Sequence, residues 1–205
     1  MTLGMSEPPI EYSIVGIILA AGESKRFGPE NKLLVEVDGV PILERVVKTI
    51  SNRGVVETIV VTGKDHDEVT TLLSGYKLQL EHNENWRNGM GSSLAKGVEA
   101  VDESSCDGIL ICLGDLPYLS SEVVGELLSV FYKCGGERIV VPEANGRRGH
   151  PVIFPISYRA ELVKLTGDQG AKVITREANS MIVEIKSSEI LRDIDSTGDL
   201  FNPVN

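Results

Sequence analysis

The feature that most constrains the fold is a series of six short, continuous apolar runs. Each run is bounded by glycine or charged residues and shows little of the polar alternation of a strand with one wet face. Uninterrupted runs of this length are typical of strands that are covered on both faces. Residues 78–82 do alternate, so this segment is predicted to be a strand nearer an edge. The six runs are residues 14–20, 57–62, 109–113, 138–141, 151–154 and 181–185.

Amphipathic helical patterns lie between these runs. Residues 41–54 place apolar side chains on one face, with Pro41 to start a helix and Gly54 to end it. Residues 92–101, behind two serines that can cap, and residues 120–136 follow the same period. The alternation predicts right-handed βαβ units and a single-domain, Rossmann-like α/β fold, with an open, mostly parallel sheet and helices on both faces.

Length and composition limit the number of domains and the partners. The chain has 205 residues, of which 41% are hydrophobic, which suits one sizeable domain with a buried core. We expect this domain to span residues 13–205, after a disordered N-terminal tail at residues 1–12. The net charge of −10 argues against a nucleic acid or an anionic membrane held by bulk charge.

Neither a membrane nor a secretory destination is indicated. No apolar run approaches the roughly 20 residues that span a bilayer. The N-terminal residues lack the basic and apolar regions of a signal peptide. Cys106, Cys112 and Cys134 form no C-x-x-C pair, so reduced, mostly packed thiols in a cytoplasmic protein are expected.

A cationic loop that contains glycine follows the first apolar run. The segment LAAGESKRFGPENK, residues 19–32, gathers Lys25, Arg26 and Lys32 in a chain that is acidic as a whole. In an open parallel sheet, ligands bind in the crevice beyond the carboxyl ends of the strands. At Gly22 the backbone can turn tightly and approach a ligand, and successive N–H groups can form an anion-binding concavity. The loop therefore predicts a triphosphate site, with a surface turn and solvated cations as the alternative.

Two commoner phosphate-binding loops are absent at this position. Counted from Gly22, a Walker A loop needs a second glycine at residue 27, where the chain has phenylalanine. The G-x-G-x-x-G fingerprint is also missing after this strand, which disfavours an NAD-type oxidoreductase.

The loop resembles a known signature. Its residues resemble the L-A-A-G-x-S-x-R-x-G signature, with a lysine shortly after it, of the molybdenum cofactor nucleotidyltransferases, in particular the cytidylyltransferase branch. Two departures from that family are Leu116, where glutamine is common, and residues 196–198, which are Ser-Thr-Gly in place of Thr-Pro-Glu. Five further segments are similar to motifs of the family in order and spacing: residues 89–94, 114–117, 146–154, 167–172 and 193–199.

The resemblance implies a nucleotide-diphospho-sugar transferase-like fold and a Mg²⁺-dependent nucleotidyltransferase. The implied reaction transfers CMP from CTP to a molybdopterin-type molybdenum cofactor and releases pyrophosphate, with a client molybdoenzyme as a further partner. One alternative is another nucleotidyltransferase, which uses GTP or activates a sugar phosphate or an alcohol phosphate. A second is a non-catalytic carrier that hands the cofactor to a molybdoenzyme.

Acidic residues in two motifs are candidates for the metal site. Asp115 follows a buried strand directly and so shares the crevice with the glycine loop. Mg²⁺ binds through one or two carboxylates plus substrate phosphates, and the resemblance implies Asp115 and Asp195 as its ligands. Asp193 and Asp195 point the same way in an extended segment, so either can reach the ion. The alternatives are a Gly-Asp-x-Pro turn at Asp115 and a solvated loop at Asp193.

The resemblance also implies a catalytic set of three cations and one carboxylate. Lys25 and Arg26 are expected to stabilise the leaving pyrophosphate, and Lys32 is expected to lie near the α-phosphate. Asp115 completes the set as the metal ligand.

The nucleotide contacts come from the glycine loop and from the turn before residues 92–101. Ala21 stands where the guanylyltransferase branch has glycine, and its methyl group predicts a preference for CTP over the larger GTP. Ser92 and Ser93 are alternatively helix N-caps. The expected nucleotide-binding residues are Leu19, Ala20, Ala21, Gly22, Ser24, Gly89, Ser92 and Ser93.

The second substrate is expected beside the GRRGHP and GDQGAK motifs. Its implied contacts are Arg147, His150 and Gly170, since the family places its pterin phosphate on this side and arginine holds phosphate through paired hydrogen bonds. His150 is alternatively structural, and Gly170 is alternatively a residue of a tight turn.

Three aromatic residues receive structural interpretations only. His66 and His82 lie in loop-like polar contexts and are given no role. Trp86 is expected to pack a loop.

Overall fold

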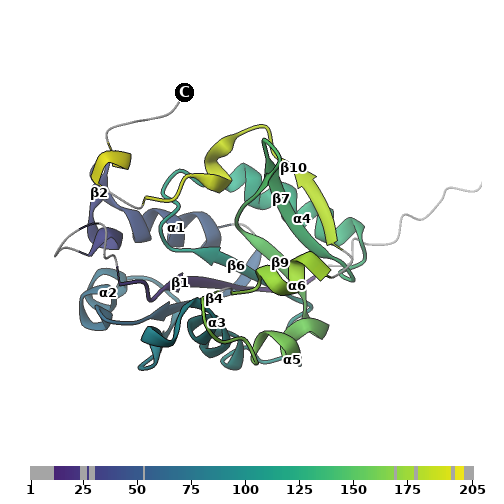
Figure 1. Cartoon of the computed structure of the whole chain (residues 1–205), viewed down its shortest axis with the longest axis horizontal. Helices are drawn as coiled ribbons and strands as arrows, with labels where there is room; N and C mark the ends of the chain where they lie inside the picture. The colour runs from purple at the N-terminus through teal and green to yellow at the C-terminus, as the bar shows by residue number, and fades with distance from the viewer. Residues whose placement is uncertain are drawn as a thin grey trace, which may run out of the picture.

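A mixed, mostly parallel sheet forms the centre of the molecule (Figure 1). Its strands follow the order β10-β7-β9-β6-β1-β4-β5, with β8 paired to β7. Strand β9 is antiparallel to β6 and β7, and β8 is antiparallel to β7, whereas the other neighbours run parallel. The computed structural model describes residues 12–23, 27, 31–52, 54–168, 170–177, 180–194 and 197–200. The strands are β1 Ile14–Ala20, β4 Val55–Thr62, β5 Gln79–His82, β6 Gly108–Leu113, β7 Ile139–Ala144, β8 Arg147–Arg148, β9 Val152–Pro155 and β10 Ser180–Glu184, with a separate hairpin of β2 Glu36–Val37 and β3 Val40–Pro41.

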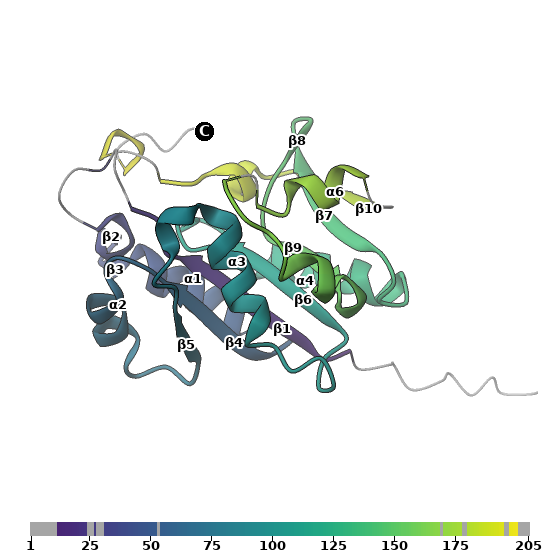
Figure 2. The same ribbon diagram turned by 60° about the horizontal axis from the view of Figure 1, so that its bottom comes forward.

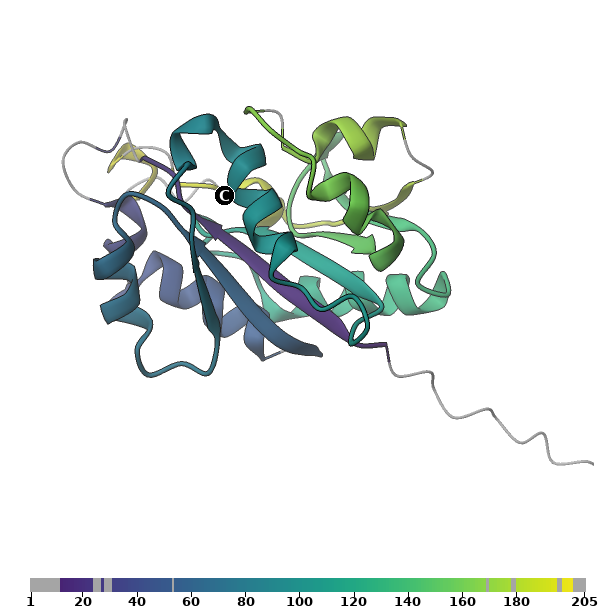
Figure 3. The ribbon, with the colours of Figure 1, turned by 90° about the horizontal axis from the view of Figure 1, so that it is seen from below.

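Two layers of helices cover opposite faces of the sheet (Figure 3). Helices α1, α2 and α4 contribute to one core, and α3, α5 and α6 contribute to the other. The helices are α1 Ile42–Ser51, α2 His66–Leu73, α3 Met90–Glu99, α4 Ser121–Lys133, α5 Arg159–Leu162 and α6 Lys172–Glu177, with 3₁₀ turns at Lys32–Leu34, Trp86–Asn88, Ile156–Tyr158, Ser188–Leu191 and Thr197–Leu200.

Strand β1 shows why the apolar runs are continuous. Ile14 and Ile18 face the core that contains α1 and α4, whereas Val15 and Ile17 face the core that contains α3. Successive side chains of a strand point to opposite faces, so a strand buried on both faces needs apolar residues throughout. The six predicted runs all form strands, and β5 lies at a sheet edge, as predicted.

Strand β10 does not fit the prediction of burial on both faces. It lies at the other edge of the sheet and pairs with β7 alone among the described strands. Val183 is buried, but the neighbouring Ile182 is 38% exposed. Only one face of β10 packs on a core, so an apolar run alone did not distinguish an edge strand from a central one.

The predicted start of α1 is confirmed, and the predicted serine caps of α3 are wrong. Helix α1 begins directly after Pro41, and the Ser120 hydroxyl caps α4 by accepting a hydrogen bond from the Val123 amide at 3.3 Å. Helix α3 instead begins at Met90, with Gly89 as its N-cap in a left-handed conformation (φ 93°). Ser92 and Ser93 therefore lie inside the first turns of α3 and do not cap it.

Two further predictions from the sequence differ from the structure. His66 begins helix α2 and His82 ends strand β5, so neither lies in a loop, and their rings stack with centroids 4.4 Å apart. Tyr12, which was assigned to the N-terminal tail, stacks on Tyr132 with ring centroids 5.3 Å apart. The rest of the predicted tail, residues 1–11, lies outside the described residues.

Two further predictions from the sequence concern packed, reduced thiols and the lack of a membrane-spanning segment. Cys106 and Cys112 are buried, and all three cysteines are free thiols. Within the described ranges, no helix combines the length and the apolar character needed to cross a bilayer.

Candidate active site

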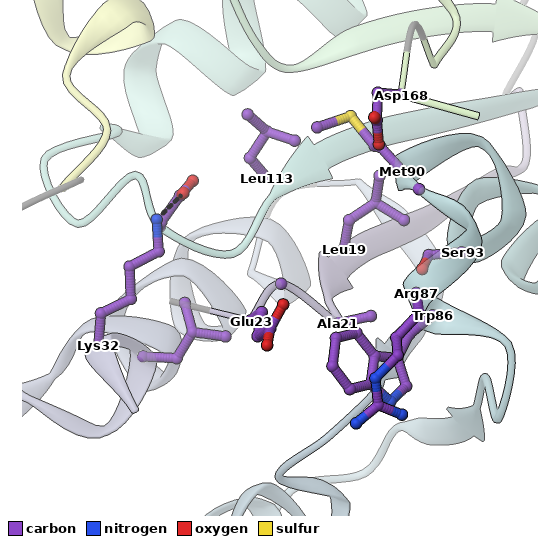
Figure 4. A pocket seen from close by; sticks show the side chains of 14 residues that line it. Leu19, Ala21, Glu23, Lys32, Trp86, Arg87, Met90, Ser93, Leu113 and Asp168 are labelled. Carbon is purple, nitrogen blue, oxygen red and sulfur yellow. Dashed lines mark hydrogen bonds and ion pairs between the residues drawn. The ribbon is translucent and has the colours of Figure 1, made fainter. Parts of the chain in front are cut away.

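A cavity of about 480 Å³ lies beyond the carboxyl ends of β1 and β6 and beside the start of α3. Figure 4 shows Lys32 at one end of this cavity and Trp86 at the other. The position is the crevice that the parallel sheet predicts. We call it the first cavity, and it is lined by Leu19, Ala21, Gly22, Glu23, Lys32, Leu33, Trp86, Arg87, Gly89, Met90, Ser93, Leu113, Asp115 and Asp168.

The glycine loop lines this cavity where the structure describes it. Leu19, Ala21 and Gly22 face the cavity, whereas Ala20 is buried in the core. A Cβ atom at Gly22 would meet no atom of the described residues within 4 Å, so none of them blocks this side of the loop to a ligand. Ser24, Lys25 and Arg26 lie outside the described residues, so their predicted phosphate contacts stay predictions.

Gly63 supports the glycine loop from behind. A Cβ atom at Gly63 would lie 2.7 Å from the Ala21 carbonyl oxygen and 3.0 Å from Cβ of Trp86. Such distances leave no space for a side chain, so the backbone of the loop and the Trp86 turn meet across this glycine. Gly63 thereby sets the position of one wall of the first cavity without lining it.

Lys32 and Asp115 form a partly buried ion pair at the other end. Lys32 Nζ lies 2.6 Å from Asp115 Oδ2, and the two side chains are 12% and 17% exposed. The second carboxylate oxygen, Oδ1, is buried and has no hydrogen-bond partner among the described residues. A buried carboxylate oxygen left free in this way fits a divalent cation, which binds oxygen ligands. The described ranges hold no cluster of three or more His, Cys, Asp or Glu side chains that suits a metal ion.

A backbone contact brings the last motif to Asp115. The Ile194 amide donates a hydrogen bond of 3.0 Å to the Asp115 carbonyl oxygen. The predicted proximity of the two acidic motifs is therefore present, although Asp195 itself lies outside the described residues. Asp193 is described and lines a second cavity.

The start of α3 is fixed by hydrogen bonds within the protein. The buried Asn83 amide donates hydrogen bonds of 3.0 Å to the hydroxyls of both Ser92 and Ser93. Ser93 faces the first cavity, whereas the Ser92 hydroxyl donates to the Gly89 carbonyl within the turn. The Gly91 amide donates to the Gly167 carbonyl at 2.7 Å, so a protein carbonyl occupies this part of the helix N-terminus.

A second cavity, of about 680 Å³, adjoins the first. The two share Leu19, Met90, Leu113 and Asp168, so these residues form their common boundary. Beyond the boundary lie two predicted contacts of the second substrate, Arg147 and His150, together with Arg148, Lys172 and Arg176. The arrangement places a basic compartment directly beside the first cavity.

His150 is a neutral side chain in this second cavity. Its Nδ1 lies 3.4 Å from the Ile111 carbonyl oxygen, and the His150–Pro151 peptide bond is cis. Burial is the main cause that lowers the pKa of His150, to about 4, and the nearby Lys172 ammonium lowers it further. The imidazole is therefore uncharged at neutral pH.

Gly170 does not line either cavity within the described structure. It adopts a left-handed conformation (φ 53°), and a Cβ atom there would lie 3.2 Å from Met90 Sδ. The geometry favours the alternative of a turn residue that packs against Met90.

Several residues that line the first cavity were not predicted from the sequence. Trp86 was expected only to pack a loop, but it lines the first cavity and carries the Arg87 guanidinium 4.1 Å above its ring centroid. Its position three residues before Gly89 was the available signal. Asp168 lies inside a motif that the sequence did single out, whereas nothing local marked Glu23 as a lining residue.

The chain matches a known family along most of its length. The family model described as the MobA-like NTP transferase domain matches residues 16–182. Nicotine blue oxidoreductase of Paenarthrobacter nicotinovorans is 29% identical over 91% of this chain and 90% of its own length. The purine catabolism protein PucB of Bacillus subtilis is 27% identical over 89% of this chain and 92% of its own.

Two further proteins are similar to this chain over most of its length. A probable molybdenum cofactor guanylyltransferase of Methanosarcina acetivorans is 26% identical over 92% of this chain and 84% of its own. The crystal structure of Rv0371c from Mycobacterium tuberculosis H37Rv matches with a TM-score of 0.82 at 23% identity, over 92% of this chain and 95% of that one. The predicted fold class, a mostly parallel α/β sheet of the nucleotide-diphospho-sugar transferase kind, is confirmed.

Proposed function

Because the chain belongs to the MobA-like NTP transferase family, we propose that it transfers CMP from CTP to a molybdopterin-type molybdenum cofactor and releases pyrophosphate. The observation that carries this proposal is the pair of adjoining cavities. One holds a lysine–carboxylate pair beyond the carboxyl ends of parallel strands, and the other is basic. A nucleotidyltransferase needs a nucleotide and an acceptor side by side, and this arrangement offers a compartment for each.

The shared boundary is where the chemistry would take place. An oxygen of the acceptor phosphate in the second cavity attacks the α-phosphorus of the nucleotide in the first cavity. The new P–O bond forms as the bond from the α-phosphorus to the bridging oxygen of the β-phosphate breaks, and pyrophosphate leaves with that electron pair. Catalysis of such a transfer is mostly positioning and charge neutralisation. Leu19, Met90 and Leu113 would exclude water from this boundary.

Lys32 would supply positive charge close to the reacting phosphate. The Asp115 carboxylate holds the Lys32 ammonium at 2.6 Å, so the lysine side chain is already in position before the nucleotide binds. Lys25 and Arg26, outside the described residues, are proposed to neutralise the leaving pyrophosphate.

Asp115 is proposed as a ligand of Mg²⁺, with Asp195 as the second. The buried, unpartnered Oδ1 of Asp115 fits this assignment. When bound, Mg²⁺ would neutralise charge on the nucleotide phosphates.

Ala21 is proposed to favour the smaller base. Its carbonyl is held against Gly63 and its side chain lies on the cavity wall near Trp86. A methyl group there narrows the room for a purine, while a pyrimidine still fits. The similarity to a guanylyltransferase makes GTP the main competitor.

The test is the release of pyrophosphate by the purified protein with molybdopterin-type cofactor, Mg²⁺ and either CTP or GTP. We expect release with CTP to be clearly faster than with GTP. Equal use of GTP would leave the family assignment and remove the cytidylyl specificity. Release of pyrophosphate with a sugar phosphate or an alcohol phosphate in place of the cofactor would show that the acceptor is a different phosphate.

Two outcomes would end the proposal of catalysis. Tight binding of the cofactor without pyrophosphate release from any nucleotide would favour a carrier that serves a molybdoenzyme. Oxidation of a nicotinamide cofactor would favour the oxidoreductase chemistry in the name of one relative. A cytoplasmic location and a client molybdoenzyme remain part of the proposal, and fractionation and co-purification would test them.

A further inference from the structure

Two short basic segments line the second cavity. Strand β8 brings Arg147 and Arg148, and helix α6 brings Lys172 and Arg176. The two α6 cations are four residues apart, so they lie on the same face of the helix. Figure 2 shows β8 and α6 close together at the same end of the molecule. The four cations come from two segments that are well separated in sequence.

A direct contact fixes one segment against the other. The Arg148 guanidinium donates a hydrogen bond of 2.9 Å from Nη1 to the Thr175 carbonyl oxygen on α6. Ile174 and Thr175, which belong to α6, are buried and anchor the helix on the core. The spacing between the two basic segments is therefore set by the fold.

The remaining three cations are available to a ligand. Within the described residues, no carboxylate forms an ion pair with Arg147, Lys172 or Arg176. All three side chains are exposed where they border the cavity. Cations that are held together at a cavity without carboxylate partners suit an anion that carries several oxygen acceptors.

Three carboxylates also line the second cavity: Glu143, Asp168 and Asp193. Glu143 lies opposite Arg148 in the β7–β8 ladder. Asp193 precedes Ile194, whose amide bonds to Asp115, and Asp168 lies on the boundary with the first cavity. The four cations of β8 and α6 outnumber these three carboxylates in the lining of the cavity.

We propose that β8 and α6 form a clamp for the phosphate monoester of the acceptor, in which Lys172 and Arg176 bind it from the side opposite Arg147. The proposal rests on the nucleotidyltransferase function proposed above and names two residues that its motifs did not assign. A dianionic phosphate fits the clamp because three donors can reach its oxygens from two sides, whereas the matching alcohol offers no charge to hold.

The clamp is tested with a fluorescent pair of probes on the full chain. 6-Hydroxymethylpterin monophosphate and 6-hydroxymethylpterin differ only in the phosphate, and the fluorescence anisotropy of the pterin reports binding of each. The variants are Lys172→Gln, Arg176→Gln and the double variant. Lys133→Gln at the end of α4, on the opposite face of the sheet, is the matched control.

We expect each single variant to bind the phosphorylated probe about fivefold more weakly, and the double variant about thirtyfold or more. Binding of the alcohol should be the same in wild type and in all variants. No binding of the phosphorylated probe by wild type, unchanged binding by the double variant, or an equal loss for both probes would overturn the clamp.

The clamp and the proposed function fail in different ways. If wild type binds the phosphorylated probe through the clamp but releases no pyrophosphate from CTP and cofactor, the clamp stands and the function is wrong. If wild type turns over and the double variant keeps the wild-type KM for the cofactor, the function stands and the clamp is wrong.

Discussion

The two cavities are built in different ways. Backbones meet closely at the wall of the first cavity: Gly63 and Gly89 each leave less than 3.0 Å for a Cβ atom, and the cavity also holds the partly buried Lys32–Asp115 ion pair. The second cavity is bordered by exposed cations on two short elements, β8 and α6. From this difference we expect the shape of the first cavity to select the base of the nucleotide and the charge of the second cavity to select its ligand.

The largest effect is expected at the ion pair of the first cavity. Asp115→Asn removes the charge that holds Lys32 and that fits a metal ion, while the side chain keeps its size. We expect turnover to fall about a hundredfold or more, which is typical of losing one key electrostatic group. The measurement is kcat for pyrophosphate release at saturating Mg²⁺.

Asp38→Asn is the matched control for this change. Asp38 is an exposed carboxylate in the β2–β3 turn and lies 3.6 Å from Arg45. A surface pair of this kind contributes only about 0–1 kcal/mol, so activity should be unaffected. Near-normal turnover of the Asp115 variant would show that this carboxylate is only part of a turn.

The next largest effect should come from a residue that touches no ligand. Gly63→Ala places a methyl group 2.7 Å from the Ala21 carbonyl, so the backbone of the cavity wall must shift. We expect nucleotide affinity to fall about tenfold or more, with a loss of stability of about 1–3 kcal/mol. The fluorescence of Trp86, the single tryptophan of the chain, can report the nucleotide titration because it lines the cavity.

Gly75→Ala controls for the loss of a glycine as such. A Cβ atom at Gly75 would meet no atom of the part of the chain that the structure describes within 4 Å, so this variant should bind nucleotide as wild type does. The comparison of the two cavities predicts that Gly63→Ala leaves the KM for the cofactor unchanged. If both substrates are lost in parallel, the two cavities do not act as separate compartments.

The sequence predicted the fold more fully than the walls of the site. The buried strands were visible because burial on both faces forces continuous apolar runs. The start of α3 could not be predicted, because it depends on a hydrogen bond from the Gly91 amide to the Gly167 carbonyl of a distant segment. The local pair of serines gives no information about that contact. Trp86 and the α6 cations were missed for the same reason: their role depends on what lies across the cavity.

A smaller effect is expected in the second cavity, in the dependence of stability on pH. The folded-state pKa of His150, about 4, is below its ordinary value of 6.5, so the unfolded chain binds more protons between these values. Stability is therefore fully present above about pH 6.5 and falls as the pH falls towards 4. We expect a loss of about 2 kcal/mol between pH 7 and pH 5 from this group.

Urea unfolding of wild type and His150→Asn at both pH values measures this contribution. Asparagine keeps a donor for the Ile111 carbonyl but does not titrate. The pH-dependent loss should shrink in the variant. If both proteins lose the same stability, His150 is not the group that burial keeps neutral.

The smallest effect is expected for Ala21→Gly, and it addresses shape recognition most directly. Ala21 is buried against Gly63 on the wall of the first cavity, so removing its methyl group widens the wall without removing charge. One methyl-sized change discriminates between ligands by only about 1–3 kcal/mol, so the preference for CTP should relax by about tenfold. The ratio of kcat/KM for CTP and GTP in wild type and variant measures it. The KM for the cofactor should stay unchanged, because we expect the second cavity to select its ligand by charge. A variant with an unchanged nucleotide ratio would show that base choice is set elsewhere on the wall, with Trp86 and Ser93 as the next residues to change.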